Sequence, residues 1–153
     1  MSTYEKLIIE SYEVEVVEKH FKSKAKGLCK GNKIAISKTL KTTAEKACIL
    51  AEELGHYYTT VGNILDQATI ENRKQEMRAR AWAYMRLIPL EHFLDAYNAG
   101  ITNRYELAEF LDVTEDFLID VLAYYKGKYG VSKIVGNFEI YFEPLVIIHI
   151  FYR

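Results

Sequence analysis

Glu52, Glu53 and His56 lie within five residues of one another, and their types and spacing suit metal-assisted hydrolysis. Residues four apart in a helix project from the same face, so Glu52 and His56 can reach one divalent cation. The acid next to the first of them, Glu53, can act as general base on a water molecule that the cation activates. The five residues read E-E-L-G-H and differ from the zinc-binding pattern H-E-x-x-H at the first position. Glutamate also binds zinc, but as a harder, anionic oxygen ligand.

The same residues have a simpler interpretation, because polar side chains four apart often form only a solvated helix face. A catalytic zinc site needs three protein ligands and an open position, so a third ligand must come from elsewhere in the chain. Glu76, twenty residues after His56, is the first candidate. Glu71 is a weaker one, since an acid near a helix start commonly complements the helix dipole. Glu76 could instead be an exposed acid paired with Arg80 at i+4.

A helix around residues 48–60 would hold the motif against a core. At 100° per residue its apolar positions form one stripe, made of Ala47, Leu50, Leu54, Tyr57 and Val61. The other side carries Glu45, Cys48, Glu52, His56 and Thr59, with Glu53 close to it. Thr42 or Thr43 is the expected N-cap.

The residues before this helix predict a small sheet. Ser2 or Thr3 can cap a short helix over 4–11, and the valines of 14–17 suggest a strand. Residues 27–37 predict a hairpin that turns at Gly31-Asn32. We therefore expect an antiparallel sheet of about three strands before the motif helix.

The residues after this helix predict a largely helical remainder. A loop over 62–69 precedes a helix over 70–87, whose alanines allow a neighbouring helix to approach closely. Further helices are expected over 90–99, 104–111 and 114–129. Strands over 131–135, 137–142 and 145–152 follow, with a hairpin turn at Gly136-Asn137. The expected fold class is α+β, with a core over 1–89 and a helical part with a terminal β-hairpin over 90–153, or one continuous domain.

Composition excludes several classes of protein. Of the 153 residues, 50% are hydrophobic and 27% charged, which is typical of a folded domain, and the net charge of −1 gives no overall attraction to nucleic acid or membrane. The longest apolar run, Leu145–Phe151, is too short to span a membrane, and the two cysteines form no paired motif. We expect a cytoplasmic protein. Residues 19–41 carry eight lysines and no acid, which suggests either a partner-binding face or protection of a strand edge.

Three segments together resemble the ImmA/IrrE family of small metallopeptidases, over about residues 4–125. Gly27–Ser37 resembles the hairpin before the family's active helix, and Leu50–His56 resembles its L-A-H-E-L-G-H segment. Glu76–Pro89 resembles its E-x-x-A-x-x-F-A…L-M-P segment, with five positions in register: Glu76, Ala79, Trp82, Ala83 and Pro89.

The resemblance implies a reduced zincin fold, with a small sheet, the motif helix and a second ligand-bearing helix. It implies ligand roles for His56 and Glu76 and the general-base role for Glu53, and it places Glu52 where the family has its first histidine ligand. Better-studied members, carried by phages and mobile elements or acting in stress responses, cleave a cognate helix-turn-helix repressor. We therefore expect a metal-dependent endopeptidase in a bacterial host, acting on such a repressor and not on nucleic acid or membrane directly.

The glutamate at position 52 affects the metal. Two carboxylates donate more charge than one, lower the Lewis acidity of the cation and shift preference from zinc toward harder ions such as manganese. Three outcomes stay open: activity with altered metal preference, weak metal binding, or an inactive relative that still binds its partner.

A DNA-binding regulator is the competing class. Residues 105–121 have the pattern of a helix-turn-helix, but residues 106–120 carry six acids and no base, which would repel phosphates. His20, His92 and His149 lack a partner at ligand spacing, and the tyrosines near the motif (Tyr57, Tyr58 and Tyr84) are as compatible with packing as with catalysis.

Overall fold

The computed structural model describes residues 1–60 and 70–151, in two units that cover Met1–Leu87 and Ile88–Arg153. The first unit contains α1 Thr3–Glu10, β1 Glu15–Lys19, β2 Gly27–Lys30, β3 Lys33–Ser37, α2 Thr43–Thr59 and α3 Ile70–Leu87. The second contains α4 Leu90–Asn98, α5 Arg104–Leu111, α6 Glu115–Tyr129, β4 Ser132–Val135, β5 Phe138–Phe142 and β6 Leu145–His149. The α+β class is confirmed, whereas the division into two domains stays a prediction. The expected loop over 62–69 and Val61 lie outside the described residues.

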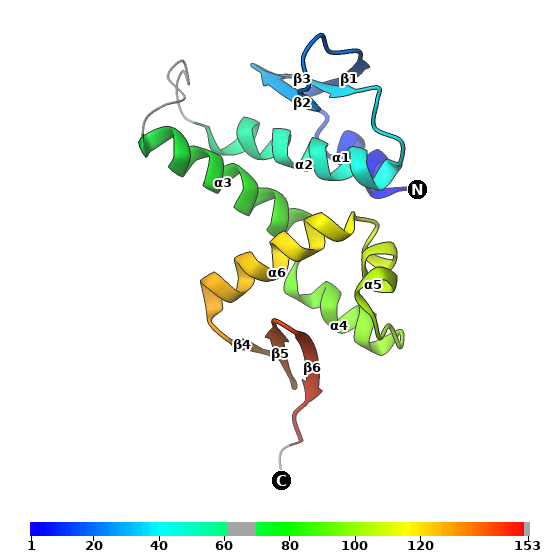
Figure 1. Ribbon diagram of the computed structural model, residues 1–153, viewed down its shortest axis with the longest axis vertical. Coiled ribbons are helices and arrows are strands. Elements are labelled where there is room, and N and C mark those ends of the chain that lie inside the picture. Colours follow the sequence, from blue (N-terminus) through cyan, green and yellow to red (C-terminus); the bar gives the residue numbers. More distant parts are fainter. Residues whose placement is uncertain (61–69, 152–153) are drawn as a thin grey trace. The chain divides into compact units, whose positions relative to one another are not determined.

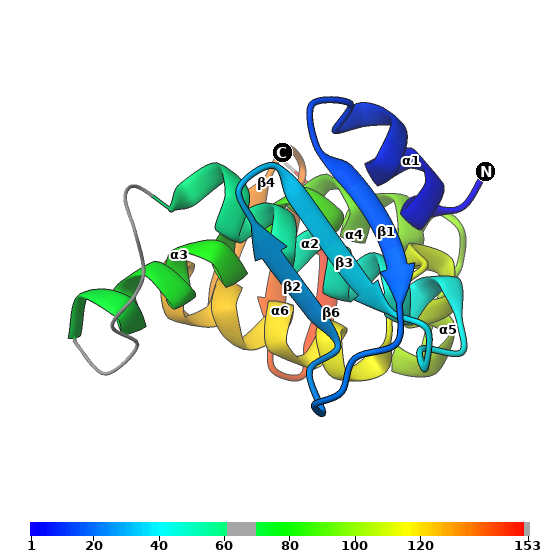
Figure 2. The same ribbon diagram turned by 90° about the horizontal axis from the view of Figure 1, so that it is seen from above.

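The first sheet has the strand order β1-β3-β2 and is mixed (Figure 2). The hairpin of β2 and β3 turns at Gly31-Asn32 as predicted, and Gly31 has the positive φ of 60° that this turn requires. The prediction of an antiparallel sheet is wrong for β1, which pairs in parallel with β3. Alternating residues indicate which face of a strand is buried, but they do not specify which neighbour the strand pairs with or in which direction.

Helix α2 lies between this sheet and α3 (Figure 1). The side chain of Thr42 caps it by accepting a hydrogen bond from the backbone N–H of Glu45 at 3.1 Å. The predicted stripe is buried at Ala47, Leu50 and Leu54, each 0% exposed. Residues outside the stripe are buried too: Cys48, Ala51 and Gly55. The expectation for Cys48 is therefore corrected, because α2 is covered on two sides rather than one.

Helices α2 and α3 touch through their backbones. A Cβ atom added to Gly55 would lie 2.1 Å from the carbonyl oxygen of Ala79, so only glycine fits at this crossing. Ala79 and Ala83, four residues apart on α3, are fully buried, which confirms that small residues on this helix admit a close neighbour. The contact brings the residues one turn before Ala79 next to the C-terminal half of α2.

An ion pair ties the sheet to the start of α2. Lys46 Nζ lies 2.8 Å from Glu18 Oε1, and the hydroxyl of Tyr4 donates to Glu18 Oε2 at 3.1 Å. The hydrogen bond from Lys46, followed by that from Tyr4, holds the pKa of Glu18 below its ordinary value.

This lowered pKa predicts a pH-dependent contribution to stability. A carboxyl group whose pKa is lower in the folded state stabilises the fold above its unfolded pKa, and the contribution is lost as the pH falls through the folded value. Both side chains are partly exposed, so we expect Glu18→Gln to lower the free energy of unfolding by about 0.5–1 kcal/mol at pH 7. Urea denaturation at pH 7 and pH 3 measures the effect, which should be smaller at pH 3 than at pH 7. Glu15→Gln, on the same strand but in none of the ion pairs among the described residues, is the control.

The second unit packs three helices against an antiparallel sheet, β4-β5-β6. The turn at Gly136-Asn137 is confirmed, and the tail adds a third strand to the expected terminal hairpin. The buried hydroxyl of Tyr125 donates to the carbonyl oxygen of Ile88 at 2.8 Å and ties α6 to the start of the unit. Between α5 and α6 the chain turns at Asp112, in the left-handed conformation, and Thr114 caps α6. Among the described helices, none is both long and apolar enough to cross a membrane.

Candidate active site

His56 and Glu76 meet between α2 and α3. His56 Nε2 lies 3.0 Å from Glu76 Oε2, and the two side chains are 24% and 41% exposed. The other oxygen of Glu76, Oε1, lies 3.3 Å from Arg80 Nε. The sequence left open whether Glu76 faces the motif or pairs with Arg80, and in the structure it does both. The side chain of the weaker candidate, Glu71, lies outside the described part of the chain.

Glu53 lies on the sheet side of this pair and is largely buried. A Cβ atom added to Gly27 would lie 3.2 Å from Glu53 Oε1 and 3.0 Å from its Cγ, so the carboxylate lies directly against the start of β2. Burial, followed by the negative charges of Glu52 and Glu76, raises the pKa of Glu53 to about 7. A base with a pKa near the working pH is suited to accept and return a proton.

Glu52 is the third predicted ligand, and this role stays a prediction. It is partly buried on α2, four residues before His56, and its charge acts on Glu53. Within the described ranges, 1–60 and 70–151, no three His, Cys, Asp or Glu side chains form a group that could hold a metal ion. The pair of His56 and Glu76 is in place, whereas the ligand set of three stays a prediction.

The chemistry of these donors fits a divalent cation. Burial, followed by repulsion from Glu52 and Glu76, raises the pKa of Glu53, and the imidazole of His56 lies against Glu76. A cation would relieve this repulsion, because it supplies the positive charge that three carboxylates lack.

The sequence did not single out Gly27 and Gly55 as site residues. Both allow a close approach: Gly55 lets α3 reach α2, and Gly27 makes room for Glu53. A signal was available at position 55, since a glycine inside a helix costs stability and usually has a packing reason. No local signal marked Gly27, because its neighbour Glu53 is distant in sequence.

Two of the tyrosines near the motif and His149 make packing or surface contacts. Tyr58 donates a hydrogen bond to Glu13 and stacks on Trp82, with ring centroids 5.1 Å apart. Tyr84 is 9% exposed. His149 stacks on Phe138 at 4.8 Å, which is a packing role.

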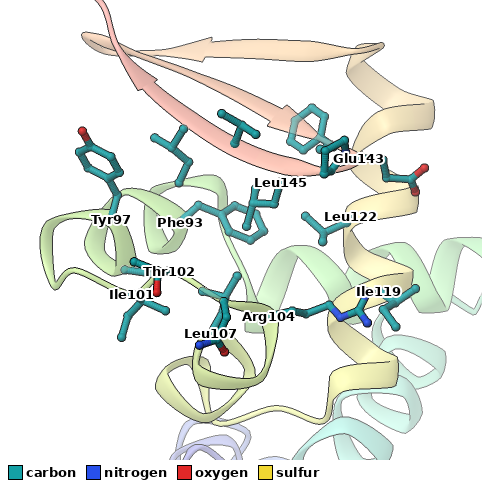
Figure 3. Close-up of a pocket in the computed structure, with 16 residues that line it drawn as sticks. Phe93, Tyr97, Ile101, Thr102, Arg104, Leu107, Ile119, Leu122, Glu143 and Leu145 are labelled. Atoms are coloured by element: carbon teal, nitrogen blue, oxygen red, sulfur yellow. The ribbon is translucent and has the colours of Figure 1, made fainter.

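A separate pocket of about 660 Å³ lies within the second unit, between α4, α5, α6 and the β5–β6 turn (Figure 3). Its walls are mostly apolar, with Phe93, Leu122 and Leu145 among them. Its two charged residues have partners: Arg104 Nε lies 3.8 Å from Glu115, and Glu143 lies 3.2 Å from Lys126. None of the predicted site residues lines this pocket.

The chain matches a known protein family. A sequence model described as the IrrE N-terminal-like domain, peptidase family M78, matches residues 7–121, which include every predicted site residue. No curated protein and no solved structure matched the chain.

Proposed function

The chain belongs to the ImmA/IrrE family of M78 peptidases, which suggests a metallopeptidase, and we propose that it is a metal-dependent endopeptidase. The observation that carries the proposal is the meeting of His56 and Glu76 near the partly buried carboxylate of Glu53. We propose His56, Glu76 and Glu52 as the residues that hold the cation and Glu53 as the general base. Zinc is the expected metal, and manganese is the alternative because a second carboxylate shifts the preference toward harder ions.

The proposed reaction is hydrolysis of a peptide bond. When bound, a divalent cation would polarise the scissile carbonyl and make water a better nucleophile. Glu53 accepts a proton from the attacking water as the new bond from oxygen to the carbonyl carbon forms. Glu53 then passes that proton to the leaving nitrogen as the carbon–nitrogen bond breaks, so the carboxylate is regenerated. Burial is the main reason that the pKa of Glu53 is raised to about 7. At that pKa the carboxylate can accept the proton in the first step and release it in the second.

We propose a cognate helix-turn-helix repressor as the substrate, in line with the resemblance to family members that cleave such repressors. The acidic side chains of α5 and α6 would repel the phosphates of DNA, and phosphate contacts dominate DNA affinity. We therefore do not expect this surface to bind DNA directly. A low-salt gel shift of the purified protein should therefore show no retarded DNA.

The test is metal binding and hydrolysis measured together. We expect purified protein supplemented with zinc or manganese to hold about one ion per chain and to cleave its cognate repressor, with loss of both under chelation. Glu76→Ala should lower the metal content by an order of magnitude or more, because it removes a ligand. Lys74→Ala, an exposed change on the same helix, should leave the content unchanged. A metal content that Glu76→Ala does not alter would contradict the proposed ligand set.

The alternative is an inactive relative that binds the repressor without cleaving it. Two observations favour it: glutamate occupies position 52, and the described residues contain no ready group of three ligands. Stable co-purification of intact repressor with metal-free protein would support this alternative, whereas metal-dependent cleavage would exclude it.

A further inference from the structure

Strand β2 is an edge strand, so within the described part of the chain only one of its two sides pairs with another strand. The backbone N–H of Ser37 donates to the carbonyl of Lys26 at 2.8 Å, and the register places Leu28 opposite Ala35 and Lys30 opposite Lys33. In an antiparallel ladder, every second residue directs its N–H and C=O toward its partner strand. Lys26, Leu28 and Lys30 therefore bond to β3, and the groups of Gly27 and Cys29 point away from it.

This free edge begins at the proposed general base. Gly27 lies against the Glu53 carboxylate. Burial, followed by the negative charge of that carboxylate, raises the pKa of Cys29 to about 11. A polypeptide strand added to β2 would pair with Gly27 and Cys29 and would pass beside Glu53. Figure 2 shows β2 at the edge of the sheet and β1 at the opposite edge.

The outer face of β2 carries a distinct side-chain pattern. Lys26, Leu28 and Lys30 alternate with Gly27 and Cys29 and so project from one face, where all three are exposed and Leu28 is 51% exposed. None of the ion pairs among the described residues involves Lys26 or Lys30. Lys30 is also directly opposite Lys33, a like-charge pair that is unfavourable across strands.

Protection of the edge alone does not account for this pattern. Lysines do discourage unwanted strand pairing, but a protected edge avoids an exposed apolar residue at its centre. Leu28 occupies that centre, between two unneutralised lysines and beside open backbone groups. The arrangement suits a strand that is bound selectively rather than excluded.

We propose that β2 selects an extended substrate segment with the pattern acid–x–apolar–x–acid. The two acidic side chains would lie next to Lys26 and Lys30, and the apolar one next to Leu28, because cross-strand neighbours on one face are in contact. This inference rests on the proposed function, since it defines the substrate of the same site. It specifies the chemistry of the recognised segment, whereas the identity of the repressor is a separate question.

Equilibrium binding tests the inference apart from hydrolysis. Two fluorescein-labelled peptides, T-E-T-L-T-E-T and T-K-T-L-T-K-T, are titrated with the full-length Glu53→Gln protein, and fluorescence anisotropy gives the affinities. We expect the acidic peptide to bind about tenfold more tightly than the basic one. Adding K26E and K30E should reverse the preference. Adding K22E and K24E instead, which reverses two exposed charges outside the strand, should leave the preference as it was.

Each outcome decides one proposal. Equal or undetectable binding of the two peptides overturns the inference. It is also overturned if both pairs of lysine changes alter the peptide preference equally, because that result would reflect only the general charge of the surface. A melting curve for each variant confirms that it is folded. If the wild-type protein with zinc or manganese cleaves the repressor but shows no preference for the acidic peptide, the proposed function stands and this inference fails. If the preference is present without cleavage, the inference stands and the peptidase proposal fails.

Discussion

Replacing Glu53 by glutamine is expected to reduce repressor hydrolysis by about 10²–10⁴-fold, the usual contribution of a positioned general base. Glutamine has nearly the same shape and keeps its place against Gly27, but it cannot accept the proton of the attacking water. The comparison is made with zinc and with manganese, by following loss of intact repressor over time. Metal content should be unchanged, because Glu53 is not among the proposed ligands.

The same substitution should increase stability, which a purely structural residue would not do. Burial raises the pKa of Glu53 from 4.5 to about 7, so the folded protein binds more protons than the unfolded chain between these values. Stability contributed by this group therefore falls as the pH rises from about 4.5 to about 7. In chelator at pH 8, we expect the glutamine variant to be more stable than wild type by on the order of 2–3 kcal/mol.

The pH dependence supplies the control for this stability effect. Near pH 4.5 the wild-type carboxyl is mostly protonated in the folded state, and the two proteins should unfold at nearly the same denaturant concentration. Equal turnover by both proteins would remove Glu53 from the mechanism. A variant less stable than wild type at pH 8 would mean that the carboxylate is stabilised in the fold rather than strained.

Replacing Gly55 by alanine should cause the largest loss of stability. The new methyl group would lie 2.1 Å from the carbonyl oxygen of Ala79, and a backbone atom on another helix cannot rotate away as a side chain can. The helices must separate, at a cost of about 3 kcal/mol, the upper end of the usual range for overpacking. Thermal unfolding should show a fall in Tm on the order of 10 °C.

The matched control is Gly127→Ala on α6. Gly127 is also inside a helix, but a Cβ atom added there meets nothing within 4 Å. Alanine should therefore raise the free energy of unfolding by about 0.5–1 kcal/mol, through its better helix propensity. A similar response of the two glycines to alanine would show that helix propensity, rather than the crossing, decides both.

Separation of α2 and α3 should also disturb the proposed metal site. Glu76 is one turn before Ala79, so a shift of α3 away from Gly55 also moves Glu76 away from His56. We expect Gly55→Ala to bind metal more weakly at temperatures where it is still folded, and isothermal titration with zinc would measure this. Unchanged zinc affinity in the folded variant would separate the helix crossing from the metal site.

Local patterns in the sequence were sufficient for much of the fold. Thr42 is a cap as expected, and the hairpin turn falls at Gly31-Asn32. The helix over 70–87 has the predicted bounds. These features depend on hydrogen bonds and side-chain spacing within a few residues, which is the range over which a single sequence can be interpreted reliably.

The sequence alone also indicated metal-assisted hydrolysis, because the geometry of one helix determines how Glu52, Glu53 and His56 are spaced. Only the tertiary structure decided that Glu76 reaches His56, that Glu53 is buried against Gly27, and that β1 runs parallel to β3. Each of these depends on how closely two backbones approach through space. Periodicity encodes which face of an element is covered, but the partner that covers it, and its distance, emerge only when the whole chain is packed.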